Sequence, residues 1–182
     1  MQPCSPPRRI LGPARLPVPV EQVKAPLRLA GIADHDEEVE RLIVAAVDLL
    51  DGHRGLLGYA LERQTWEATY PALAGVLELP LGPVAEVVSI TWWDGTGAAQ
   101  VVAPADYALD AAAGTVAAVE GWPDLGHAAM AAARPVVRWV AGVGCGAAEA
   151  GAIAALVRHW FDGGVGVPRA ILDQLPRRLL AV

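Results

Sequence analysis

With 182 residues, the chain has the length of one domain and is long enough to bury a sizeable core. Hydrophobic residues make up 54 % of it and mean hydropathy is +0.36, yet no stretch approaches the roughly 18 uninterrupted apolar residues that a membrane-spanning helix needs. The net charge is −6, and the 14 cationic residues are scattered, whereas a protein that grips nucleic acid normally has a basic patch. We therefore expect a soluble protein that does not cross a membrane and does not bind nucleic acid specifically.

The N-terminal residues 1–20 are rich in proline and have no periodic apolar pattern, which predicts an irregular arm. The alternative is that residues 1–20 have no role in the protein. Prolines also interrupt the short apolar stretch after Arg9, so we expect no export signal. With only Cys4 and Cys145 available, a disulfide framework has no support, and we assign a reducing compartment.

The clearest predicted element is an amphipathic helix that ends at Gly52. Its apolar residues recur at the spacing of one helical face: Val39, Leu42, Ile43, Ala46, Val47 and Leu50. A shorter helix is expected over residues 21–29, interrupted at Pro26. Because neither helix can be stable alone, both must pack on a partner.

From about residue 60 the sequence predicts short strands. In residues 64–70, alternation places Trp66, Ala68 and Tyr70 on one face. The turn Asp94-Gly95-Thr96-Gly97 predicts a hairpin. Further strands are expected over residues 76–79, 84–93, 98–102, 107–109, 115–119 and 135–143. Strands this short and closely spaced indicate an antiparallel sheet.

A second amphipathic helix is predicted by the spacing of Ile153, Leu156, Val157, Trp160 and Phe161. A last helix begins at Pro168 and ends at Pro176. We therefore predict an α+β fold in which the N- and C-terminal helices pack as a small bundle with an inserted, mainly antiparallel sheet. The predicted domains are an arm, residues 1–20, and a single domain, residues 21–182, made of helical parts 21–57 and 147–182 and a β-rich insert 58–146.

Little in the sequence indicates catalysis or a cofactor. The four histidines (His35, His53, His127 and His159) are far apart, no metal-ligand spacing is present, and we expect no metal and no cofactor. A thiol hydrolase that uses Cys145, with His127 or His159, is one alternative function. The glycines around Cys145 have an ordinary explanation as a turn after a strand, however, and nothing near it in sequence lowers a thiol pKa.

Two further features are candidate contact sites. Trp92 and Trp93 should point to opposite faces of their strand, so that one is buried and the other exposed. The exposed one would lie at a subunit interface or be buried under a loop. A ligand-binding β-module that uses Trp92 or Trp93 is the second alternative function. The segment Arg177-Arg178-Leu179-Leu180, after a helix-ending proline, is either a frayed tail or a docking peptide.

The order of these motifs resembles that of tailed-phage head–tail connector (adaptor) proteins, including the adaptor of phage-derived gene transfer agents. The motifs are 64-QTW-66, 77-LELPLGPV-84, 87-VVSIT-91, 94-DGTG-97, 106-DY-107, 122-WP-123, 137-VRWVAG-142, 159-HW-160 and 167-VP-168. They cover roughly residues 23–178. The proline-rich arm and residues 179–182 lie outside this pattern.

The resemblance implies a non-enzymatic structural subunit in the neck of a virion or phage-like particle, assembled in the bacterial cytoplasm. Such a subunit forms a ring, commonly of twelve copies, that joins the portal to the stopper or tail protein and lets DNA pass. Its C-terminal segment would dock into the portal, which assigns that role to Leu175, Arg177, Arg178 and Leu179.

Overall fold

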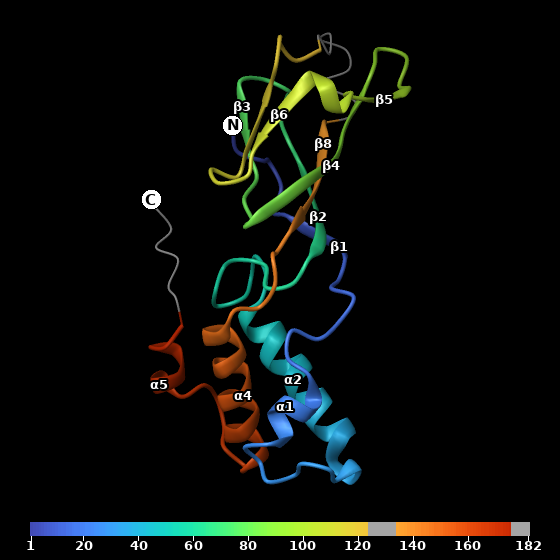
Figure 1. Cartoon of the computed structure of the whole chain (residues 1–182). Coiled ribbons are helices and arrows are strands. Elements are labelled where there is room, and N and C mark those ends of the chain that lie inside the picture. The colour runs from blue at the N-terminus through green and yellow to red at the C-terminus, as the bar shows by residue number, and fades with distance from the viewer. Residues whose placement is uncertain (124–133, 176–182) are drawn as a thin grey trace. The chain divides into compact units, whose positions relative to one another are not determined.

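The computed structural model describes residues 1–123 and 134–175 and divides the chain into two compact units. The sheet unit consists of Met1–Pro13 and Arg63–Val143, and the helical unit consists of Ala14–Glu62 and Gly144–Val182 (Figure 1). Each unit therefore combines segments that are far apart in the sequence. No helix in the described part of the chain is long and apolar enough to cross a membrane.

The sheet unit contains two antiparallel sheets among its described residues. The larger has the strand order β1-β2-β8-β4-β5, and the smaller has the order β3-β7-β6. The strands are β1 (Arg8–Leu11), β2 (Gln64–Thr69), β3 (Val76–Glu78), β4 (Val84–Trp93), β5 (Ala99–Val101), β6 (Tyr107–Asp110), β7 (Thr115–Ala118) and β8 (Val136–Ala141). A short 3-10 helix, Pro104–Asp106, joins β5 to β6.

Strand β8 lies at the centre of the larger sheet, where it pairs with β2 and β4. Its residues alternate between the two faces: Val137, Trp139 and Ala141 are buried. The Trp139 indole N–H donates a hydrogen bond of 3.0 Å to the carbonyl oxygen of Leu81, so this buried polar group has a partner.

The opposite face of this sheet carries an ion-pair network. Glu67 on β2 accepts hydrogen bonds from Arg8 on β1, at 2.9 Å, and from Arg138 on β8, at 2.6 Å. Partial burial alone would raise the pKa of Glu67, but the two guanidinium groups outweigh it and hold the pKa below its usual value. One carboxylate therefore binds two guanidinium groups and links β1, β2 and β8 across this face.

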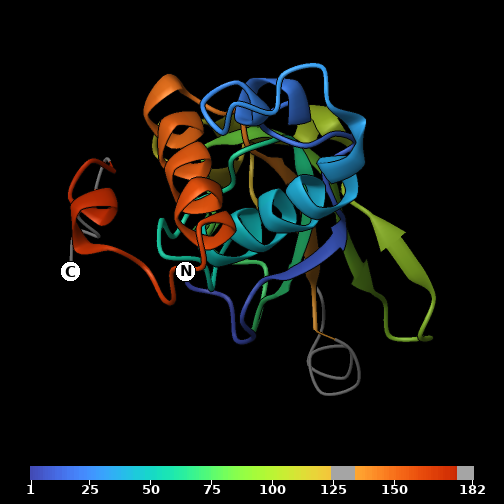
Figure 2. The ribbon, with the colours of Figure 1, turned by 90° about the horizontal axis from the view of Figure 1, so that it is seen from below.

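The helical unit contains α1 (Val20–Lys24), α2 (Asp36–Leu50), α4 (Ala147–Phe161) and α5 (Arg169–Leu172), with a 3-10 turn, Ala33–His35, before α2. Figures 1 and 2 show α4 alongside α2. All six apolar residues predicted for the first long helix are buried on α2, and those of α4 that join the same core are Ala152, Ile153, Leu156 and Val157. The buried Lys24 donates a 2.9 Å hydrogen bond to Glu21 and forms an ion pair with Asp36, which ties α1 to the start of α2.

The predicted bundle of terminal helices with one inserted sheet is wrong, although the chain is α+β. Among the described helices, α1 and α5 have five and four residues, so they are too short to be members of a bundle. Prolines account for this, because Pro26 follows α1 and Pro176 follows α5. The strands form two sheets, and β1, within the segment predicted to be irregular, belongs to the larger one.

The buried hydrogen bond of Trp139 should make a measurable contribution to the stability of the sheet unit. We expect Trp139→Phe to lower the free energy of unfolding by about 1–3 kcal/mol, because it leaves the Leu81 carbonyl buried without a donor. Denaturant titration followed by circular dichroism measures this. Trp122→Phe is the matched control, since the Trp122 N–H bonds the Gly75 carbonyl oxygen at the surface. Equal losses in the two variants would contradict the assignment.

Candidate interaction site

Trp92 and Trp93 stand at the end of β4, beyond the last residue that β8 covers. The pairing of β4 with β8 ends at Thr91, whereas Trp92 and Trp93 pair with Gln100 and Ala99 of β5. Both indoles are half-buried. The prediction that one is buried and the other exposed is therefore wrong, because at this point of the sheet only β5 flanks the strand.

The turn after Trp93 is fixed by one carboxylate. Asp94 accepts hydrogen bonds from the Thr96 backbone N–H (2.9 Å), the Thr96 hydroxyl (2.6 Å), the Ala98 backbone N–H (3.1 Å) and the Gln100 side-chain amide (2.9 Å). These hydrogen bonds lower the pKa of Asp94 to about 2, and the bond from the Thr96 hydroxyl contributes most. The hairpin predicted from this sequence is confirmed.

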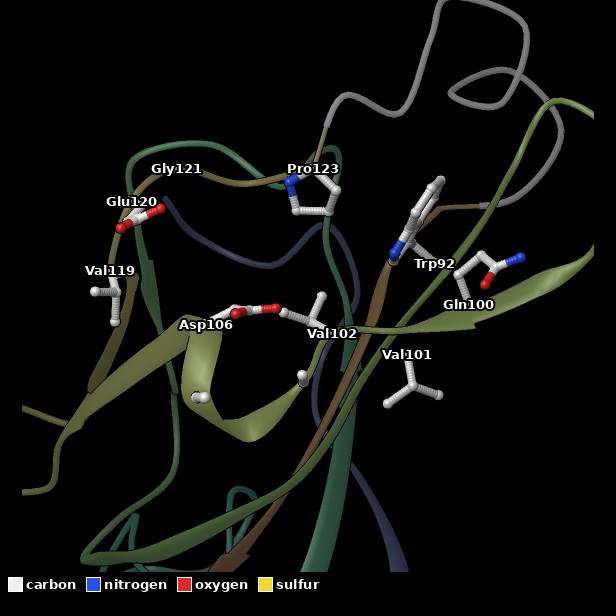
Figure 3. A pocket seen from close by; sticks show the side chains of 11 residues that line it. Trp92, Gln100, Val101, Val102, Asp106, Val119, Glu120, Gly121 and Pro123 are labelled. Carbon is white, nitrogen blue, oxygen red and sulfur yellow. The ribbon is translucent and has the colours of Figure 1, made fainter.

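A pocket of about 580 Å³ opens beside this hairpin. Its lining comes from β4, β5, the Pro104–Asp106 turn and the segment after β7, and includes Trp92, Gln100, Val101, Asp106, Val119 and Glu120. Figure 3 shows Trp92 and Gln100 on one side, Val119 and Glu120 on the other, and Asp106 between them. The volume is within the range of pockets that hold small ligands or side chains of a partner.

The pocket combines apolar and acidic groups. Val101 and Val119 are 63 % and 62 % exposed, which is high for aliphatic side chains. Asp106 and Glu120 are exposed, and within the described residues neither forms an ion pair. Sequence reasoning singled out Trp92 but missed the other residues, because they come from four separate segments. The sequence offered one signal for Glu120, which is that it stands two residues before the Trp122-Pro123 motif.

The predicted portal-docking segment begins inside the helical unit. Leu175 is 7 % exposed and belongs to the core that α2 and α4 share. Its side chain therefore packs inside the unit instead of facing a partner. Arg177, Arg178 and Leu179 lie outside the described residues.

Cys145 lies in a loop before α4 and has acidic neighbours. Its backbone N–H donates a 3.1 Å hydrogen bond to Glu62, and Glu149 on α4 accepts a 2.5 Å hydrogen bond from the Tyr59 hydroxyl. Burial and the negative charges of Glu149, Glu62 and Asp51 raise the pKa of the Cys145 thiol to about 11. A thiol nucleophile needs the opposite shift, so this environment suppresses the chemistry that a thiol hydrolase requires.

The histidines were the other candidates for chemistry. His159 is in the last turn of α4, and one of its ring nitrogens lies 3.3 Å from the carbonyl oxygen of Val165, so its side chain contacts the loop that follows the helix. His127 lies outside the described residues. Within residues 1–123 and 134–175, no three His, Cys, Asp or Glu side chains are placed to hold a metal ion.

Comparison with known proteins identifies the fold. No family model matches the chain, and no curated protein matches its sequence. A chain in the neck of an empty gene transfer agent particle computed with C6 symmetry matches with a TM-score of 0.72 and 20 % identity, over 98 % of this chain and 99 % of that one. Chains in the virion of a native gene transfer agent particle and in the neck of a native particle computed with C12 symmetry give TM-scores of 0.70 and 0.63, at 21 % and 19 % identity and the same coverage. The resemblance that the motif order predicted is confirmed for the fold.

The hydrogen bonds of Asp94 should persist to unusually low pH. A carboxyl group whose pKa is lowered stabilises the folded state above its unfolded pKa, and this stabilisation is lost as pH falls through the folded pKa of about 2. In pH titrations by nuclear magnetic resonance, we expect the amide shifts of Thr96 and Ala98 to change with a midpoint near pH 2. A midpoint near 4 would show that the carboxylate does not hold the turn. Asp94→Ala should remove the titration and leave the β2–β8 amides unchanged.

The raised pKa of Cys145 predicts low thiol reactivity. Since the pKa lies about two units above the ordinary value of 9.0, the thiolate fraction at neutral pH should fall about 100-fold. In a Cys4→Ser background, we expect alkylation of Cys145 by iodoacetamide to be slow at pH 7 and to accelerate up to pH 11, as measured by mass spectrometry. Glu149→Gln should speed it modestly by removing one negative charge. Rapid alkylation at pH 7 would revive the thiol-enzyme hypothesis.

Proposed function

We propose that this chain is a structural head–tail adaptor subunit of a tailed phage or phage-like particle. In this role it joins the portal to the tail side of the neck and lets DNA pass. It acts by fitting between other proteins and transforms no substrate.

The observation that carries the proposal is the length of the fold match. The likeness to neck chains of gene transfer agent particles covers 98 % of this chain and 99 % of the first of them, so it involves both units and not a shared substructure. The ordered motifs found in the sequence support the same assignment independently of the three-dimensional comparison.

The proposed assembly is a ring, with twelve copies as the favoured number. Two of the matching structures are necks computed with C6 and C12 symmetry, which are both cyclic. The proposed partners are neighbouring copies, the portal protein, and a stopper or tail protein on the other side. The particle neck is the proposed location, after assembly in the bacterial cytoplasm.

The C-terminal segment is the proposed contact with the portal. Leu175 packs in the core of the helical unit and directly precedes this segment in the sequence. Arg177, Arg178 and Leu179 combine two cations with an aliphatic side chain and are the proposed docking residues. Leu175 then serves as the anchor of the segment.

The charge of the chain suits a passage for DNA. A net charge of −6 disfavours tight binding of phosphates, so a ring of such subunits would let a duplex slide. The raised pKa of Cys145 argues against the thiol hydrolase as the alternative function.

Co-expression with a portal protein from the same genome tests the proposal. Electron microscopy of the purified complex should show a ring of this chain seated on the portal. We expect Arg177→Ala with Arg178→Ala to reduce its occupancy at least about tenfold, because two charged contacts are removed.

The matched control is Arg41→Ala with Arg54→Ala, which removes two exposed cations from the same unit. These substitutions should leave the ring intact. A persistent lack of complex at micromolar concentrations for the unmodified chain would contradict the adaptor function, and equal effects of the two pairs would contradict docking through the C-terminal segment.

A further inference from the structure

The two edges of the larger sheet carry complementary groups. In the order β1-β2-β8-β4-β5, strands β1 and β5 lie at opposite edges. An edge strand presents backbone N–H and C=O groups that can pair with another chain, and natural proteins usually protect such edges. Here both edges are exposed along their whole length, because every residue of β1 and of β5 is exposed.

Strand β1 offers a basic and aliphatic surface. Its sequence is Arg8-Arg9-Ile10-Leu11, and Ile10 and Leu11 are 40 % and 66 % exposed. The ion pair of Arg8 with Glu67 is exposed on the arginine side, and exposed pairs contribute little, so this guanidinium can change partner at low cost. Glu67 also pairs with Arg138 on β8, so it keeps a cationic partner when Arg8 turns to another carboxylate.

The pocket at the other edge offers the opposite combination. Asp106 and Glu120 supply two negative charges without an ion-pair partner among the described residues, and Trp92, Val101 and Val119 supply an apolar wall. A guanidinium group satisfies carboxylates through charge-assisted hydrogen bonds, and it also packs on an indole face. The pocket therefore fits an extended segment that contains arginine and an aliphatic residue.

We propose that the pocket beside β5 in one copy of this chain receives the segment Arg8–Leu11 of a second copy. This inference rests on the proposed ring and names the contact that closes it. A contact between two different surfaces of identical subunits is heterologous, and it generates a closed ring when the rotation between copies closes. Opposite edges of one sheet are suitably placed for such head-to-tail contact.

The charges favour this occupant over two others that the chain could supply. Residues 124–133 follow Pro123 in the sequence and contain no lysine or arginine, with His127 as their one basic residue and Asp124 as an acidic one, so they offer no guanidinium group to Asp106 and Glu120. The only other adjacent arginines are Arg177 and Arg178. Segment Arg8–Leu11 is held extended by β2, so little ordering is required when it binds.

A synthetic peptide of residues 6–13 (PPRRILGP) tests the contact without requiring a ring. Titrated into the full ¹⁵N-labelled chain, it should cause saturable shifts of amides in residues 100–106 and 119–121. The same peptide with both arginines replaced by glutamate should bind at least about tenfold more weakly, and salt should weaken the original peptide through screening.

Charge reversal separates the proposed contact from loss of folding. Asp106→Arg with Glu120→Arg should abolish binding of the original peptide and restore binding of the glutamate peptide. Glu40→Arg, an exposed reversal on α2, is the control and should change neither. No shift up to millimolar peptide, tighter binding of a peptide of residues 175–182, or nuclear Overhauser contacts of residues 124–133 across the pocket would each overturn the inference.

A cross-linking arm distinguishes this inference from the proposed function. In a Cys4→Ser, Cys145→Ser background, Leu11→Cys with Val101→Cys should give an intermolecular disulfide ladder in rings assembled on the portal. Rings without the ladder and without peptide binding would overturn the contact and leave the adaptor function standing. Peptide binding to a chain that never forms a ring would support the contact and count against the adaptor function.

Discussion

Strand β8 holds the larger sheet together, because it pairs with β2 on one side and with β4 on the other. These two strands come from positions far before it in the sequence, so the sheet is complete only after the chain returns. The same strand supplies Trp139 to the interior and Arg138 to the opposite face, where Arg138 and Arg8 share Glu67. Both the packing of Trp139 in the interior and the ion pairs of Glu67 therefore depend on the register of one central strand.

Periodic patterns in the sequence predicted the individual elements well. The spacing of Val39 through Leu50 defined α2, because one helical face must be apolar when it packs on a core. Strand β2 was predicted with its buried face, since alternation of side chains is fixed by the pleat. Strand β1 was missed because Pro6, Pro7 and Pro13 surround it, and its pairing with β2 is decided by long-range contacts that local propensity does not contain.

The arrangement of elements and the site were less predictable, and for the same reason. The predicted helical bundle was wrong because two of the helices are too short to pack along their length. Prolines limit the length of α1 and α5 to five and four residues. Trp92 was recognised as a candidate contact residue, yet Asp106 and Glu120 approach it only because the two hairpins bring separate segments together. In the same way, the carboxylates that raise the pKa of Cys145 include Glu62, 83 residues earlier in the chain.

The turn at Asp94 affects the association rate of the proposed contact between two copies of this chain. Four hydrogen bonds to one carboxylate fix the tip of the β4–β5 hairpin, and this hairpin forms one wall of the pocket. The conformational entropy of that wall is lost when the chain folds, so it is not lost again on association. For the proposed contact between copies, a preorganised wall of this kind favours productive encounters, since an arriving segment does not have to wait for a loop to order.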